Sequence, residues 1–196
     1  MKAKFFIILG VLALLVFYGI SVNNSLVTAE EQVNSAWAQV ENQYQRRADL
    51  IPNLVNTVRG AADFESETLQ DVIEARSRAT SVNIDANDLN NPEMFQQFQE
   101  AQSQLSGALS RLLVTVERYP ELQANQNFRD LQVQLEGTEN RIATERMRFN
   151  QAAQGFNTQI RKFPTSLFAS ILGFDQKEYF QAEEGAEQAP EVDFGN

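Results

Sequence analysis

The sequence predicts an all-α protein in which an N-terminal transmembrane helix is followed by an antiparallel, up-and-down four-helix bundle with a short C-terminal helix. Residues 5–20 (FFIILGVLALLVFYGI) are apolar throughout. The rest of the chain repeats apolar residues at helical spacings of three and four and shows almost no strand-like alternation. We therefore expect a cytoplasmic stub and anchor at residues 1–29, a helical bundle at residues 30–180 and a disordered acidic tail at residues 181–196.

The N-terminal segment has the length and composition of a membrane anchor. No charged residue lies between Phe5 and Ala29, and a bilayer core is crossed by roughly 20 apolar helical residues. Positive charge favours the cytoplasmic side, so Lys2 and Lys4 predict a cytoplasmic N-terminus and a body on the outer, periplasmic side of the cytoplasmic (inner) membrane. Two lysines leave the inverse orientation open. A signal peptide cleaved before Glu30 and a buried core helix are the alternative interpretations.

Composition excludes several classes of function. The chain of 196 residues carries a net charge of -10 and contains neither cysteine nor histidine. An acidic surface repels phosphate backbones, so we expect no nucleic-acid partner. The missing residue types exclude disulfides, thiolate zinc sites, Ser-His-Asp triads and the Glu-x-x-His pairs of di-iron bundles. No spacing of the remaining polar residues indicates a catalytic site, a cofactor or a metal, and we expect a protein that is not an enzyme.

The first helix of the body is indicated by apolar residues that recur at spacings of three and four from Val33 to Ala62. Pro52 lies inside this pattern and predicts either a kink or a restart of the helix, for which Asp49 is a candidate cap. A glycine and a serine stand at the two ends of residues 60–66 and predict a turn there, and one very long bent helix is the alternative that the apolar seam also permits. The second helix follows this turn.

The next segments are set apart by Asn, Asp and Pro. Residues 81–91 are rich in Asn and Asp, but their spacing does not match an EF-hand and indicates turns rather than calcium binding. Asn91 and Pro92 are typical of an N-cap and a first helical residue, and the third helix continues to Tyr119–Pro120. The fourth helix is expected in residues 128–160, where a long apolar seam favours near-parallel packing against its neighbours.

The C-terminal part predicts one more helix. A short apolar segment ended by a glycine follows Pro164, in residues 165–174. We expect it to cover one end of the bundle as a lid, and a contact with the membrane surface or with a partner is the alternative. Trp37, the single tryptophan, is expected to anchor the core near the membrane-proximal end. From Glu183 onward the chain is acidic and without basic residues, which is typical of a disordered tail.

Several strings of this sequence resemble the LemA family. Trp37–Glu41 (WAQVE) and Tyr44–Val55 (YQRRADLIPNLV) are the most specific matches. Further matches extend the resemblance over nearly the whole chain: Leu112–Val114, Glu139–Ala143, Arg146, Phe149–Asn150, Asn157 and Phe163–Pro164. The resemblance implies a bacterial protein with one N-terminal membrane helix and a helical bundle. It implies no agreed biochemical activity and no assigned catalytic residue. Some LemA-like proteins are encoded near zinc-dependent membrane proteases, which makes a membrane protease a candidate partner.

Two groups of polar residues within these strings are the candidate site. We expect them either to pair charges across helices and fix their register, or to form a docking surface for another protein, while a catalytic carboxylate site is disfavoured. The first helix contributes Glu41, Arg46, Arg47, Asp49 and Asn53, and the fourth helix contributes Glu139, Arg146, Asn150 and Asn157.

The functional prediction is a single-pass membrane protein that acts as a non-catalytic scaffold or adaptor. Its expected partners are the membrane and other membrane or envelope proteins. The alternative is a sensor that binds a small ligand between the helices of a membrane-tethered bundle. Sequence alone leaves the oligomeric state open.

Overall fold

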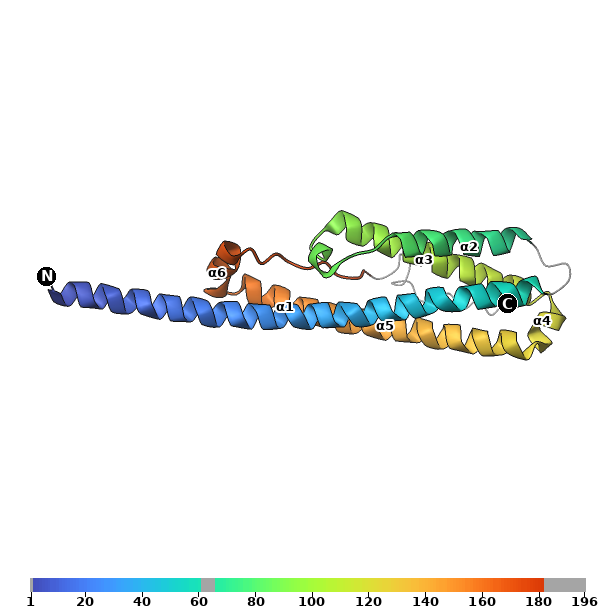
Figure 1. Cartoon of the computed structure of the whole chain (residues 1–196), viewed down its shortest axis with the longest axis horizontal. Helices are drawn as coiled ribbons and strands as arrows, with labels where there is room; N and C mark the ends of the chain where they lie inside the picture. Colours follow the sequence, from blue (N-terminus) through green and yellow to red (C-terminus); the bar gives the residue numbers. More distant parts are fainter. Residues whose placement is uncertain (1, 61–65, 182–196) are drawn as a thin grey trace, which may run out of the picture.

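A computed structural model describes residues 2–60 and 66–181 of the chain, and all regular secondary structure in this part is helical (Figure 1). The all-α prediction is confirmed. The elements are α1 (Lys2–Arg59), α2 (Ser66–Ser81), the 3-10 turn η1 (Ala86–Asp88), α3 (Pro92–Val116), α4 (Pro120–Ala124), α5 (Gln126–Arg161) and α6 (Thr165–Leu172). The expected turn at residues 60–66 falls mostly outside the described residues, and so does the expected acidic tail beyond Gln181.

The anchor segment and the first helix of the body are one helix. α1 contains 58 residues, which at 1.5 Å per residue corresponds to a length of about 87 Å. It passes without interruption through the expected boundary at residue 29 and through Pro52, so the expected alternative of a restart at Asp49 is wrong. Its N-terminal part is long and apolar enough to cross a membrane, and its apolar side chains between Phe5 and Ile20 are exposed.

A hydrogen bond from α2 explains how a proline is accommodated inside α1. Pro52 has no N–H to donate to the carbonyl of Ala48, four residues earlier, and this would leave a carbonyl without its helical partner. Arg76 on α2 supplies the missing donor, because its Nε donates to the Ala48 oxygen at 2.7 Å. The proline therefore creates a point of attachment between α1 and α2.

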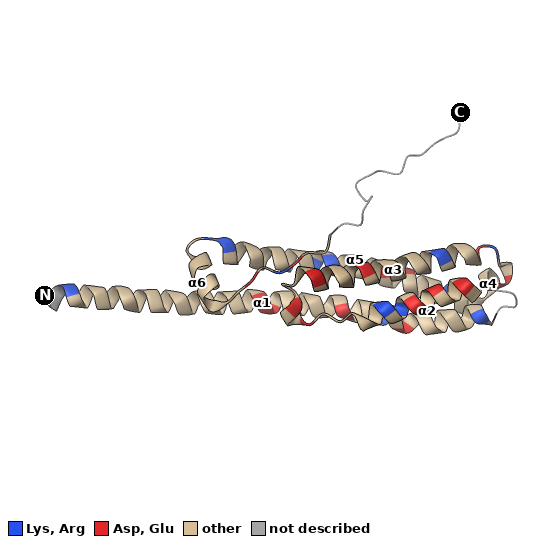
Figure 2. Cartoon of the chain, turned by 90° about the horizontal axis from the view of Figure 1, so that it is seen from above, with Lys and Arg blue, Asp and Glu red and all other residues tan. Residues whose placement is uncertain are grey.

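The long helices pack as two antiparallel pairs. α5 lies against α1 over most of its length, α2 lies against α3, and α2 also contacts α1 (Figure 1). Charged residues are spread over this body, whereas the N-terminal part of α1 carries basic residues only at its very start (Figure 2). The predicted cap of α3 is confirmed, since the Asn91 side chain accepts hydrogen bonds from the backbone N–H groups of Glu93 and Met94 at 3.1 and 3.2 Å.

Buried apolar side chains form two separate clusters along the body. The proximal core, nearer the anchor, includes Val33, Trp37, Tyr44, Phe95, Phe98, Phe149, Phe156 and Phe180. The distal core, nearer the C-terminal end of α1, includes Ile51, Leu54, Val58, Leu105, Leu112, Phe128 and Leu135. Trp37 is 1% exposed, as expected of a core anchor, and its Nε1 donates to the Ile84 carbonyl at 3.2 Å.

The chain after α5 turns back toward the body. α6 ends at Gly173, whose φ of 78° is left-handed and is adopted at little cost only by glycine. α6 packs against α1 and the end of α5, and residues 174–181 then run in an extended conformation along the body (Figure 1). We call residues 174–181 the strap. No sequence pattern predicted it.

Candidate functional site

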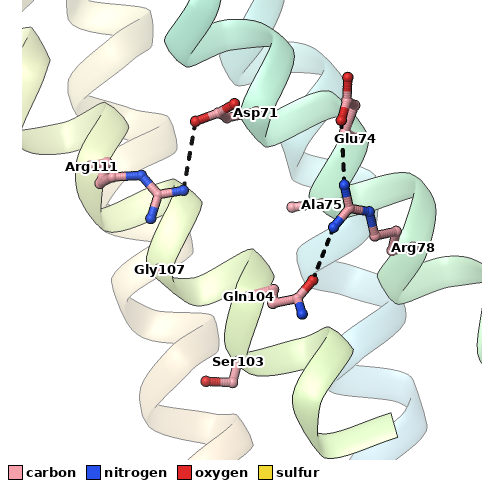
Figure 3. A pocket seen from close by; sticks show the side chains of 8 residues that line it. All are labelled: Asp71, Glu74, Ala75, Arg78, Ser103, Gln104, Gly107 and Arg111. Carbon is pink, nitrogen blue, oxygen red and sulfur yellow. Dashed lines mark hydrogen bonds and ion pairs between the residues drawn. The ribbon is translucent and has the colours of Figure 1, made fainter. Parts of the chain in front are cut away.

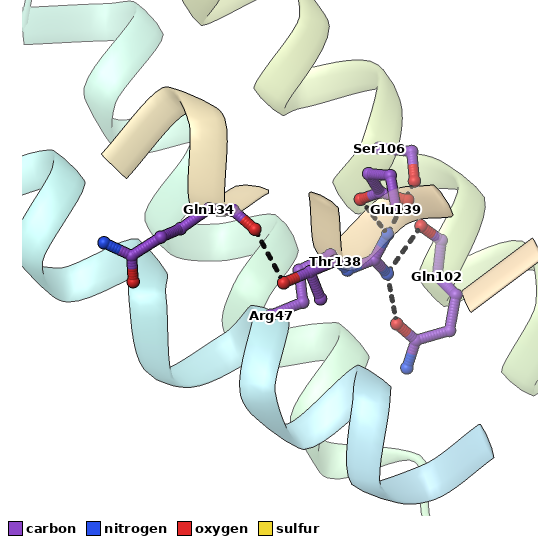
Figure 4. A network of polar contacts seen from close by, with 6 residues as sticks. All are labelled: Arg47, Gln102, Ser106, Gln134, Thr138 and Glu139. Carbon is purple, nitrogen blue, oxygen red and sulfur yellow. Dashed lines mark hydrogen bonds and ion pairs between the residues drawn. The ribbon is translucent and has the colours of Figure 1, made fainter. Parts of the chain in front are cut away.

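A buried arginine separates the two apolar cores. Arg47 lies on α1 between the proximal core, which ends at Tyr44, and the distal core, which begins at Ile51, and it is only 1% exposed. Its Nη1 donates to Ser106 Oγ and to Glu139 Oε1, both at 2.8 Å (Figure 4). The Arg47–Glu139 contact is an ion pair between α1 and α5, and the carboxylate remains 42% exposed.

Gln102 extends these contacts to a further helix. Arg47 Nη2 donates to Gln102 Oε1 at 2.5 Å, and Gln102 Nε2 in turn donates to the Ala79 carbonyl of α2 at 3.1 Å. We call Arg47, Gln102, Ser106 and Glu139 the polar layer. Because it joins α1, α2, α3 and α5 at one level, a shift of any of these helices along its axis would break hydrogen bonds of buried groups. Both Nη atoms of Arg47 have acceptors, whereas its buried Nε has no hydrogen-bond partner among the described residues.

The asparagines of α5 bind the backbone of the strap. Asn150 Oδ1 accepts from the Phe180 N–H and its Nδ2 donates to the Phe180 carbonyl, both at 2.9 Å. Asn157 makes the same pair of bonds with Lys177, both at 2.8 Å. Each side-chain amide thus forms with one residue of the strap the pair of backbone hydrogen bonds that a neighbouring β-strand would form. Arg146 completes the row, since its Nη2 donates to the Gln181 carbonyl at 3.0 Å.

The strap is also held by its own side chains. Phe180 enters the proximal core, with its ring centroid 5.0 Å from that of Phe95 and stacked at 6.0 Å on Trp37. Lys177 is buried and its Nζ donates to Glu30 Oε1 on α1 at 2.7 Å. The strap therefore covers the proximal core between α1, α3 and α5. Its ion pair with α1 holds it in this position.

The structure divides the predicted site residues into three groups. Arg47 and Glu139 meet in the polar layer, and the other three residues predicted on α5 hold the strap. The remaining predicted residues of α1 are exposed: Glu41, Arg46, Asp49 and Asn53. The two sets of residues therefore do not form a single site, and most of them make internal contacts.

Sequence reasoning missed the partners of these residues. Gln102 occupies a position of the α3 apolar seam between Phe98 and Leu105, and Arg47 occupies the equivalent position between Tyr44 and Ile51. A polar residue at a seam position on each of two helices is a signal for a buried polar contact. Lys177 and Phe180 carry no such signal, because the strap has no periodic pattern.

Glu41 borders a cleft of about 220 Å³ between α1 and the residues around η1, lined also by Asn83, Ile84 and Phe98. Glu41 is exposed at the surface of α1, but partial desolvation of its carboxyl at this cleft raises its pKa above the ordinary value, and the nearby carboxylate of Asp85 raises this pKa further. The folded chain thus holds this proton more tightly than the unfolded chain does.

We expect Glu41→Gln to stabilise the protein at neutral pH and to have no effect at a pH below the ordinary Glu value of 4.5. Because the pKa of this carboxyl is higher in the folded than in the unfolded chain, its deprotonation lowers the free energy of unfolding as the pH rises above 4.5 and through the folded-state pKa. Glutamine has no proton to lose here, so the substitution removes that loss. Thermal unfolding at both pH values measures the difference. Glu31→Gln, an exposed glutamate of the same helix, is the control for the change in charge. Equal stability of wild type and Glu41→Gln at neutral pH would contradict this account of Glu41.

A second hollow lies on the outer surface of α2 and α3 and has a volume of about 440 Å³ (Figure 3). Its charged side chains contact one another. Arg111 lies 3.7 Å from Asp71, and Arg78 bridges Glu74 at 3.4 Å and Gln104 at 3.3 Å. Since these groups satisfy each other at the surface, the hollow offers no support for the ligand-sensor alternative. Among the described residues, no group of three or more acidic side chains converges on a point that could hold a metal.

Comparison with known sequences now identifies the family. The sequence model of the LemA family matches residues 36–194, which include the polar layer and the strap. The chain belongs to the LemA family. The match confirms the resemblance in the Trp37–Val55 strings, and it begins beyond the apolar segment of α1.

Two kinds of relative are similar to this LemA-family chain. Protein LemA of Metamycoplasma hominis is 25% identical over 182 residues, which cover 92% of this chain and 79% of that protein. Magnetosome protein MamQ 2 of Paramagnetospirillum magneticum is 28% identical over 174 residues, which cover 81% of this chain and 64% of that protein. Magnetosome protein MamQ of Magnetospirillum gryphiswaldense is 40% identical over a shorter stretch of 73 residues. The chain thus spans less than two thirds of the MamQ proteins.

Proposed function

We propose that this LemA-family chain is a membrane-anchored, non-catalytic scaffold or adaptor for other membrane or envelope proteins. The observation that carries the proposal is the continuity of α1, which runs from the exposed apolar segment into the body without a break. A continuous helix transmits position and orientation, so a partner bound to the body would be held at a fixed place relative to the bilayer. The names of the similar proteins refer to a cellular structure or to the family itself rather than to a reaction.

The interior of the body supports a structural role rather than chemistry. Polar residues in the sequence strings that match the LemA family make internal contacts. Arg47 joins helices, and Asn150 and Asn157 bind the strap. Tuned acid and base groups facing a cavity are the usual mark of an active site. Glu41 is the described carboxyl whose pKa is shifted, and the charged group that contributes to this shift is a second carboxylate, Asp85.

The exposed side of α1 is the surface that we propose for docking. Polar residues recur there at spacings of three and four, so they project from one face of the helix. We call this face the α1 polar strip: Asn42, Gln45, Arg46, Asp49, Asn53 and Asn56. Arg46 is an exposed cation without an ion pair to another described residue, on a chain of net charge -10. An acidic group on a partner would therefore form an ion pair with Arg46.

Photo-crosslinking tests the docking proposal. A benzoylphenylalanine at Asn53 is expected to crosslink the full-length chain to a discrete membrane or envelope protein in intact cells, and Arg46→Glu is expected to suppress that product. The same crosslinker at Val133, which is 67% exposed on α5, is the control. Identical products from both positions, or products consisting only of a second copy of the chain, would contradict the scaffold proposal. A membrane protease among the Asn53 products would identify one class of partner.

The proposal includes the position of the protein in the cell. Lys2 and Lys4 favour a cytoplasmic N-terminus, with the body on the periplasmic side of the inner membrane and its four long helices acting as one up-and-down bundle. The chain contains no cysteine, so a single cysteine at Val133 can be labelled selectively. A membrane-impermeant maleimide is expected to react with it in intact cells with a permeable outer envelope. Reaction only after lysis of the inner membrane would support the inverse orientation.

A further inference from the structure

The short helix α6 exposes large apolar side chains. Ile171 is 82% exposed and Phe163, which precedes the helix, is 81% exposed, while Leu167 and Leu172 are 58% and 46% exposed. We call these four residues the α6 face. Scattered apolar side chains are common on soluble proteins, but four of them within ten residues form a patch that calls for a covering partner. The same helix buries Ala169 in the proximal core, so its position on the body is fixed.

The position of α6 indicates what covers this patch. Phe168 of α6 packs against α1 at the end of the apolar segment, with its ring centroid 5.5 Å from that of Tyr18. A Cβ added to Gly19 would lie 3.1 Å from Phe168 Cε1, so glycine allows this close approach. Both figures place α6 beside α1 at the boundary between the apolar segment and the charged body (Figures 1 and 2). α6 therefore lies beside the C-terminal end of the exposed apolar surface of residues 5–20.

The length of the apolar segment leaves room for a second lipid contact. Residues 5–20 span about 24 Å as a helix, whereas the hydrocarbon core of a bilayer is about 30 Å thick. The next turn of α1 contains Ser21, Asn23 and Asn24, which are poor lipid contacts. α6 lies beside this end of the segment and supplies apolar surface there. Arg161 and Lys162 are exposed at the end of α5, just before α6, and cations of this kind attract lipid phosphates.

We propose that α6 is a second membrane-contacting element, which inserts the α6 face into the lipid interface of the leaflet next to the body. This inference rests on the proposed anchoring of the chain through α1. Two points of contact, one spanning and one interfacial, prevent the body from pivoting about the anchor. Because α6 is also joined to the strap, the lipid contact is linked mechanically to the closure of the proximal core.

Depth-dependent fluorescence quenching tests this proposal on the full-length chain. Single cysteines at Leu12, Ile171 and Val133 are labelled with an NBD fluorophore, and the protein is reconstituted into vesicles of phosphatidylcholine and phosphatidylglycerol. We expect spin-labelled lipids to quench the labels at Leu12 and Ile171 and to leave the label at Val133 unaffected. Aqueous iodide is expected to quench Val133 several-fold more strongly than Ile171. Val133 is the matched control, because it is an apolar residue with 67% exposure on a distant part of α5.

The three positions separate failure of this inference from failure of the proposed anchoring. Lipid quenching at Leu12 together with iodide quenching at Ile171 equal to that at Val133 would overturn the role of α6 alone. Shielding of Ile171 from both quenchers would overturn it too, because it would indicate a protein partner or a second copy on the α6 face. Absence of lipid quenching at Leu12 would overturn the anchoring. A graded set of nitroxide depths that places Ile171 nearer the headgroups than Leu12 is the supporting result.

Discussion

Replacing Arg47 by alanine is expected to lower the free energy of unfolding of the body by about 3 kcal/mol, because it removes one partner of a buried, hydrogen-bonded ion pair. The substitution leaves Gln102 Oε1 without the donor that it accepts from and opens space between the two cores. Glu139 is half-exposed and can be hydrated, so the loss falls at the lower end of the range for such pairs. Urea unfolding of the detergent-solubilised chain, followed by circular dichroism, measures it.

Two further variants separate the role of the charge from the role of the packing. Arg46→Ala, at the neighbouring exposed position, is expected to change stability by no more than about 0.5 kcal/mol. Arg47→Met fills much of the arginine volume without the charge, and we expect it to be more stable than Arg47→Ala. If Arg47→Ala were as stable as the wild type, the polar layer would have no part in holding the four helices in register.

Replacing Phe180 by alanine is expected to cost about 3 kcal/mol, which is typical of a phenylalanine removed from a packed core. Phe180 is 6% exposed and contacts Trp37, Phe95 and Phe149. Its loss releases the strap from the proximal core, while the helices, which do not depend on the strap for their backbone bonds, remain folded. We therefore expect unchanged far-ultraviolet circular dichroism together with a red shift in the fluorescence of Trp37, the single tryptophan.

The matched control for Phe180 is Phe163→Ala, a change of the same residue type at a position that is 81% exposed. It is expected to leave the emission of Trp37 and the unfolding midpoint in detergent unchanged. An unshifted tryptophan spectrum in Phe180→Ala would show that the strap is not packed on the proximal core in solution.

The helices and their ends could be predicted from the sequence because the signals are local. The N-cap at Asn91, the stop at Pro164 and the glycine at position 173 act through the backbone within a few residues. The apolar seams repeat often enough to indicate which face of each long helix is buried. The sequence could not decide between a kink and a restart at Pro52, because the donor that satisfies the Ala48 carbonyl is Arg76, which lies 24 residues further along the chain.

The strap and the polar layer depend on contacts between distant parts of the chain. Asn150 and Asn157 belong to the candidate site that the sequence indicates, yet their partners are backbone groups of an extended segment with no periodicity. Arg47 pairs with a residue 92 positions away, and sequence spacing within one helix contains no information on such a distance. The predicted docking role of the polar residues is retained as a proposal only for the exposed strip around Arg46.

Hydrogen exchange along α1 tests most directly whether the anchor and the body are one rigid unit. In the full-length chain reconstituted in lipid nanodiscs, we expect the backbone amides of residues 21–32 to exchange as slowly as those of residues 40–56, since all of them belong to one uninterrupted helix. Fast exchange confined to residues 21–32 would show a flexible joint between the bilayer and the body. A body on such a joint could not hold a partner at a fixed position, and the scaffold proposal would lose its physical basis.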